Sequence, residues 1–166
     1  MTPTKKITNW SELPQPIQLF HRYFLHNDHL VLARSVGTAI TLDGQGRINV
    51  QGDVRWRSDG RSPRYFPHDL LPVQFGRVTG SFNLNGCRLI SGQGLPQGVG
   101  QHLHLQGVRN IQLQDLPHSV GGNIWLSWNP QWSLLPLLRM RVAGKVFFSL
   151  RDPDQEAVLE IGRAHV

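Results

Sequence analysis

The sequence predicts a mostly β protein, a parallel solenoid of short repeats with a helical cap at its N-terminal end. The first observation is an apolar pattern that recurs with a period of 21 in the second half of the chain. The second is the alternation of apolar and polar residues within each copy, which is typical of short strands. The third is the content of 17 Gly and 11 Pro, which favours a turn-rich β protein over a helical bundle.

The repeat consists of columns of apolar residues at equivalent positions. In chain order the columns hold Val78, Val99 and Val120; Phe82, Leu103 and Ile124; Leu84, Leu105 and Leu126; and Ile90, Ile111 and Trp132. A fainter copy follows at a spacing of 22, with Val142, Val146 and Phe148 in the same roles. Periods in this range are typical of solenoids, because one unit buries too little apolar surface to fold alone. We therefore predict one strand per repeat, paired in parallel with the strand of the next repeat.

Two copies of the repeat match the pattern L-x-L-x-x-N/C-x-L, one from Phe82 to Cys87 and one from Ile124 to Asn129. The middle copy departs from it, with Val108 where Asn or Cys is expected. Residues 71–150 therefore resemble a degenerate leucine-rich-repeat-like solenoid with LP-x-x-VGG-x-φ-x-φ repeats of a bacterial or phage type. This resemblance implies a binding or scaffold architecture and no chemistry.

Residues 1–70 are predicted to form the cap and its first short strands. A helix is expected from Gln15, because Ile17, Phe20 and Phe24 recur at helical spacing. Ser11 is the candidate N-cap of this helix. Short alternating runs at 40–42, 48–50 and 54–56 predict strands, and the composition of 58–69 predicts a loop. The runs are either an eroded repeat, two periods before the first clear copy, or an antiparallel meander; we favour strands of the same sheet.

The chain ends in EIGRAHV, which resembles the translation of a common short-read sequencing adapter. Such scars are set aside in reasoning about the fold. We therefore interpret 151–166 as a tail in which 161–166 are an artefact, and the chain as a metagenomic fragment of a longer reading frame.

The outward face of the repeat sheet is the candidate binding surface. Strand side chains alternate between faces, so the residues between the buried ones point outward. These candidate binding residues are Asn83, His102, His104, Asn123, Trp125, Lys145 and Phe147. Repeat proteins bind partners on such extended faces, and Trp is enriched at binding hot spots. The predicted function is a non-enzymatic binding or scaffold module for a protein partner, unless Trp125 and Phe147 pack against another segment of the protein.

Two other functions are weighed against protein binding. The stretch from Arg55 to Arg64 interleaves cations with rings, through Arg55, Trp56, Arg57, Arg61 and Arg64, a mixture that can hold single-stranded nucleic acid. A solvated arginine-rich loop has the same composition. The chain can also be part of a larger enzyme or effector whose remainder follows its C-terminus.

Composition and motifs exclude several classes of function. The net charge is +6, and the single cysteine, Cys87, rules out an internal disulfide and indicates a reducing compartment. No apolar run is long enough to cross a membrane, so we expect a cytoplasmic protein with no membrane contact. No phosphate loop, nucleophile elbow or zinc-protease motif is present, and we expect no catalysis and no cofactor. The histidine-rich stretches at 21–29 and 102–104 lack a metal-ligand spacing, so no metal is expected, and Cys87 is expected to be a buried structural thiol.

Overall fold

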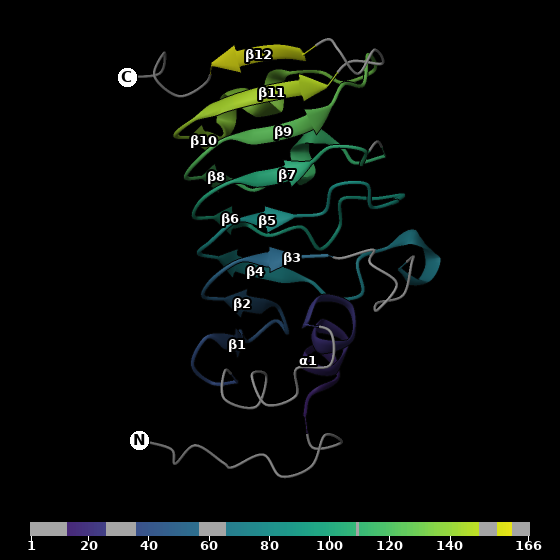
Figure 1. Cartoon of the computed structure of the whole chain (residues 1–166), viewed down its shortest axis with the longest axis vertical. Coiled ribbons are helices and arrows are strands. Elements are labelled where there is room, and N and C mark those ends of the chain that lie inside the picture. The colour runs from purple at the N-terminus through teal and green to yellow at the C-terminus, as the bar shows by residue number, and fades with distance from the viewer. Residues whose placement is uncertain (1–12, 26–35, 57–65, 109, 150–155, 161–166) are drawn as a thin grey trace.

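The computed structural model describes residues 13–25, 36–56, 66–108, 110–149 and 156–160, in which the strands form two six-stranded sheets (Figure 1). Sheet A contains, in spatial order, β1 (Ile40–Leu42), β2 (Ile48–Val50), β4 (Phe75–Val78), β6 (Gly98–Val99), β8 (Ser119–Val120) and β10 (Arg141–Val142). Sheet B contains β3 (Val54–Arg55), β5 (Phe82–Asn83), β7 (Leu103–Leu105), β9 (Ile124–Ser127), β11 (Lys145–Ser149) and β12 (Glu156–Glu160). The pairing is parallel except for β1 with β2 and β11 with β12, which close the two ends of the stack as antiparallel pairs.

The predicted fold class, a leucine-rich-repeat-like solenoid with one strand per repeat, is wrong. Each period of the repeat supplies two strands, one to each sheet, as β6 and β7 do in one copy and β8 and β9 in the next. The physical reason is a turn in the short segment between the valine of each copy and its alternating apolar pair. The chain turns at Gly100 or Gly121, so that Val99 and Leu103 pair with neighbours in different sheets. Because β6, β8 and β10 are so short, no alternation marks them in the sequence.

The register of the parallel strands follows the repeat. Phe82 pairs with Leu103, and Leu103 with Ile124, so each pair of partners is separated by one period. The N-terminal runs do not lie two periods before the first clear copy, as the eroded-repeat alternative expected. Val50 pairs directly with Val78, so β2 is the immediate neighbour of β4. The eroded-repeat alternative is therefore wrong in its spacing. The antiparallel alternative is correct only for the pair β1 and β2. β2 pairs in parallel with β4 in sheet A, and β3 pairs in parallel with β5 in sheet B.

The hydrophobic core lies between the two sheets and forms one continuous cluster from Leu13 to Phe148. The apolar columns supply its centre, as predicted. Side chains with 0% exposure in these columns are Val78, Phe82, Leu84, Leu103, Leu105, Ile111, Ile124, Leu126 and Val146. Ile90 does not follow its column, because it is 57% exposed and Leu89 takes the buried place.

The predicted helix is present at the N-terminal end of the stack (Figure 1). It begins as α1 (Gln15–Phe20) and continues as one π-helical turn (His21–Leu25). Phe20 and Phe24 meet the Phe75 ring edge-on, with ring centroids 6.0 and 5.4 Å away. The N-cap is Pro14, and the candidate cap Ser11 lies outside the described residues.

Short 3₁₀ helices follow at Pro67–Asp69, Leu113–Asp115 and Leu135–Arg139. They lie in the connections that lead from sheet B back to sheet A. No helix within the described ranges is both long and apolar enough to cross a membrane.

Candidate functional site

The outer face of sheet B carries a central column of side chains, one from each successive strand. Arg55 pairs with Asn83, Asn83 with His104, His104 with Trp125, and Trp125 with Phe147. Their neighbours along each strand, such as Leu103 and Leu105, are buried. The structure therefore brings four of the predicted binding residues, together with Arg55, into one line. We call these five residues the central column.

The rings of the central column stack on one another. The His104 imidazole and the Trp125 indole have centroids 4.5 Å apart and planes within 2°. The Trp125 and Phe147 rings follow at 5.3 Å and 9°. Rings that stack along the column show their edges, not their faces, to the solvent, and all three side chains are half-buried. The outer surface is therefore a flat strip of ring edges.

The electrostatic environment keeps His104 neutral. Burial lowers the pKa of its imidazole, and the nearby His102 and Arg55 lower the pKa further. A neutral imidazole stacks on an indole without bringing a desolvated charge to the sheet. Arg55 itself is exposed at the N-terminal end of the column. At the other end Lys145 lies beside Phe147 and pairs in the sheet with Glu160 of β12, so the exposed cation of the column is Arg55.

A second column beside it connects the strands through hydrogen bonds from backbone to side chain. The Ser81 N–H donates to Asp53 Oδ1 (2.7 Å) and the His102 N–H to Ser81 Oγ (3.1 Å). The Asn123 N–H donates to His102 Nδ1 (3.0 Å) and the Lys145 N–H to Asn123 Oδ1 (2.9 Å). His102 and Asn123, both predicted as binding residues, therefore also hold consecutive strands together. Ser81 belongs to the outward face that the alternation predicts, whereas Asp53 was predicted only as a turn residue, and the hydrogen bonds of both were missed.

Polar side chains flank the central column on its other side as well. The Gln106 N–H donates to Asn85 Oδ1 (2.9 Å), and its side-chain amide donates to Ser149 Oγ (2.8 Å). The Gly107 N–H donates to Ser127 Oγ (2.7 Å). Because both flanks are hydrogen-bonded across strands, the central column is held in a fixed arrangement.

The stretch considered for nucleic-acid binding is only partly described. Arg55 belongs to the central column, and Arg57, Arg61 and Arg64 lie outside the described residues. Trp56 is 7% exposed and packs against Phe66, with ring centroids 5.4 Å apart. Its indole is therefore too deeply buried for a base to stack on it.

The other candidate residues show no arrangement for chemistry in the described part of the chain. Cys87 is buried, and burial together with the Asp69 carboxylate raises the pKa of its thiol to about 12, so the thiol stays protonated. The His102 and His104 rings have centroids 6.2 Å apart. Across the described ranges, no group of three His, Cys, Asp or Glu side chains is placed to hold a metal ion. The candidates within 26–29 lie outside those ranges.

The structure also exposes an apolar surface that sequence reasoning did not single out. Leu134, Leu135 and Leu138 surround the last 3₁₀ helix and are 38%, 68% and 55% exposed. Leu135 lines a groove with a volume of about 430 Å³, together with Leu113 and Leu116. The sequence pattern, SLLPLLRM, gave no sign of which leucines face the solvent.

Comparison of the chain with protein-family models, with curated proteins and with solved structures finds no match. The resemblance of residues 71–150 to degenerate bacterial or phage repeats therefore stays a prediction. The central column of sheet B, and not a relative, is the basis on which a function can be proposed.

Proposed function

We propose that this chain is a non-enzymatic binding module that contacts a protein partner through the outer face of sheet B. The observation that carries the proposal is the stacked strip of His104, Trp125 and Phe147, held between two hydrogen-bonded columns. Half-buried aromatic side chains at the centre of a rigid face are typical of protein-binding hot spots. A cytoplasmic location, as expected from the single cysteine, is part of the same proposal.

The charges around the strip define the chemistry of the partner. Arg55 places an exposed cation at the N-terminal end of the strip, and at the other end Lys145 pairs in the sheet with Glu160. A complementary protein surface has an apolar or aromatic centre with a carboxylate beside it, opposite Arg55. Because the strip is already ordered, little conformational entropy is lost when a partner binds to it.

A purely structural role for the rings is the competing explanation. Stacked aromatic pairs stabilise a sheet by about 0.5 to 1.5 kcal/mol each, so Trp125 contributes to folding with or without a partner. The two explanations differ at Arg55, which is exposed and has little effect on the stack. Reversing its charge should weaken the binding of a partner but not the fold.

The experiment selects peptide binders with the full chain as bait and compares variants by fluorescence anisotropy. Trp125→Ser and Arg55→Glu should each weaken the selected binders about tenfold or more. Trp128→Ser is the matched control for the ring, because Trp128 is 38% exposed and packs against Phe148 outside the strip. Arg141→Glu is the matched control for the charge, because Arg141 belongs to sheet A. Both controls should retain binding within about twofold.

Equal losses in Trp125→Ser and Trp128→Ser would show that binding is not specific to the strip. Unchanged binding in Arg55→Glu, together with loss of thermal stability in Trp125→Ser, would assign the rings a structural role alone. Thermal unfolding of each variant, followed by circular dichroism, separates lost binding from lost folding.

A further inference from the structure

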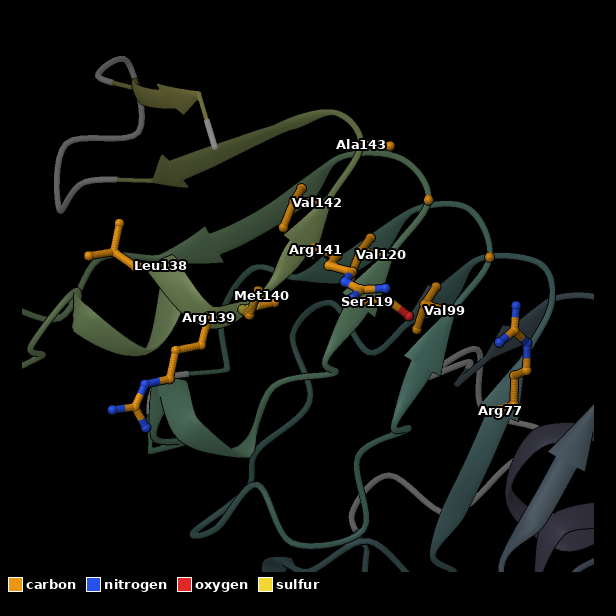
Figure 2. Close-up of a pocket in the computed structure, with 12 residues that line it drawn as sticks. Arg77, Val99, Ser119, Val120, Leu138, Arg139, Met140, Arg141, Val142 and Ala143 are labelled. Carbon is orange, nitrogen blue, oxygen red and sulfur yellow. The ribbon is translucent and has the colours of Figure 1, made fainter. Parts of the chain in front are cut away.

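The outer face of sheet A carries an open cleft that the proposed function does not use (Figure 2). Three of its lining residues, Arg77, Ser119 and Arg141, lie on one line across the sheet, since Arg77 pairs with Gly98, Gly98 with Ser119, and Ser119 with Arg141. Ser119 has a small side chain, whereas the two outer positions carry arginines. The result is a depression of about 730 Å³, which is within the range of small-molecule sites.

The cations of this cleft have no counter-charge among the residues that line it. Arg77, Arg139 and Arg141 are exposed there, and no carboxylate is among the described residues that line it. Within the described part of the chain the ion pair formed by an arginine is that of Arg88 with Asp69, outside the cleft. The positive potential of Arg77 and Arg141 is therefore available to a ligand, whereas the Arg139 side chain points away from Ser119 (Figure 2).

Ser119 adds a hydrogen-bond donor at the middle of the floor. Its Oγ lies 3.3 Å from the position that a Cβ on Gly98 would occupy, so the hydroxyl is next to the glycine on the neighbouring strand. Figure 2 shows the Arg141 side chain next to Ser119, in agreement with their pairing in the sheet. A side chain at position 98 would crowd this hydroxyl, so the glycine leaves the Ser119 Oγ unobstructed on that side.

The lining limits the chemistry of the ligand. Guanidinium groups bind phosphate oxygens in pairs of hydrogen bonds, and a hydroxyl donates a further bond. Arg77 and Arg141 are three strand spacings apart, about 14 Å between their backbones, so a ligand that meets both carries more than one anionic group. No aromatic ring is among the described residues that line the cleft, which disfavours a ligand held by stacking, such as a nucleobase.

We propose that the cleft on sheet A binds a small ligand with at least two phosphate groups, held by Arg77 at one end and by Ser119 and Arg141 at the other. This site is on the opposite sheet from the protein-binding strip and is independent of it. The ligand is recognised through its phosphate groups, and its affinity falls as salt concentration rises.

The test uses isothermal titration calorimetry of the full chain with inorganic tripolyphosphate as the probe. Arg77→Gln and Arg141→Gln should each weaken binding about tenfold, because each removes charge-assisted hydrogen bonds. Ser119→Val should also weaken it, because the methyl groups remove the donor and fill the floor. Arg88→Gln is the matched control: it removes one positive charge outside the cleft and should change the affinity by less than about twofold.

Three results would overturn the proposal. An equal loss in Arg88→Gln and Arg141→Gln would mean that the anion responds only to the net charge of +6. Orthophosphate binding as tightly as tripolyphosphate would rule out contact with both arginines. A single-stranded thymidine oligonucleotide serves as a second probe. If it binds more tightly than tripolyphosphate, and if this binding depends on Arg141, the ligand of the cleft is nucleic acid and not a small molecule. Thermal unfolding without ligand confirms that each variant is folded before its affinity is compared.

Discussion

The imidazole of His104 lies parallel to the indole of Trp125, with ring centroids 4.5 Å apart and planes within 2° of each other. The two residues are one period apart in the chain and directly opposite each other in sheet B. The stack continues to Phe147 on the next strand. The neutral ring is favoured in this position, because protonation would place a charge on a half-buried imidazole that stacks on Trp125.

The first prediction concerns the titration of His104. Its pKa should be below the ordinary value of 6.5, because of burial first and of His102 and Arg55 second. The native state then holds fewer protons than the unfolded state between this lowered pKa and 6.5. The contribution to stability is therefore complete above pH 6.5 and is lost as the pH falls towards the lowered pKa. An NMR titration of the imidazole protons measures the pKa directly.

Two variants test the causes of this shift. Arg55→Gln should raise the pKa of His104 by removing a nearby cation, and His102→Gln should do the same. Between about pH 7.5 and about pH 5.5, His104→Phe should show a smaller loss of stability in urea unfolding than the unchanged chain. A pKa of His104 at or above 6.5 would mean that the imidazole is solvated and not stacked as described.

The second prediction concerns the depth of the core at the repeat columns. Leu105 is 0% exposed and Leu135 is 68% exposed, so the same substitution can be compared at both positions. Leu105→Ala should lower the free energy of unfolding by about 3 kcal/mol, because it leaves a cavity between the sheets. Leu135→Ala should change it by less than about 0.5 kcal/mol. Similar values for the two variants, measured by urea unfolding, would show that Leu105 is not in the core.

The apolar columns could be predicted because their physical cause is visible in the sequence. Leu103 and Leu105 flank His104, Ile124 and Leu126 flank Trp125, and the two pairs are one period apart. This spacing predicts both the strand and its parallel neighbour. The N-terminal helix was predictable for a similar reason, the helical spacing of its apolar residues.

The second sheet could not be predicted, because its strands β6, β8 and β10 each contribute only one inward apolar residue. Val99 and Val120 were recognised as a column, but so short a strand has no alternation from which to infer a separate sheet. Arg77, Ser119 and Arg141 become neighbours only through that sheet, so the cleft was also missed.

On sheet B, the hydrogen-bonding roles of two predicted binding residues could not be predicted either. His102 and Asn123 were placed on the outer face, but nothing in the sequence shows that each of their side chains accepts a backbone N–H from the next strand. Such bonds depend on the turn geometry before the strand, which side-chain alternation does not specify.

The third prediction concerns the reactivity of Cys87. Its thiol is 1% exposed, and its pKa is raised from 9.0 to about 12. A thiol reagent at about pH 8 should therefore react very slowly with the native chain and completely once urea has unfolded it. Because the native thiol resists ionisation, stability should also fall as the pH rises from 9.0 towards about 12. Rapid labelling under native conditions would contradict the buried position, with Cys87→Ala as the unlabelled control.

The last prediction concerns the glycine that directly follows the valine in two copies of the repeat, Gly100 and Gly121, where the other two copies have Thr79 and Ala143. A Cβ at Gly121 would overlap the carbonyl oxygen of Gly100, and a Cβ at Gly100 would overlap the carbonyl oxygen of Thr79. These positions lie where successive turns of the chain stack from one sheet to the other, and the Gly121 N–H donates to the Val99 carbonyl (2.9 Å). The backbone on both sides is held in the parallel ladder and cannot move away from an added methyl group.

Gly121→Ala should therefore lower the free energy of unfolding by about 2 kcal/mol or more, because two layers of the stack would have to separate locally. Gly44→Ala is the matched control, since no atom lies within 4 Å of the added Cβ in the turn between β1 and β2. That variant should be neutral or slightly more stable, because alanine restricts the unfolded chain. Urea unfolding of both variants measures the difference. A tolerated alanine at position 121 would mean that the turns are not packed backbone against backbone, and the glycine of the repeat would then need another explanation than close approach.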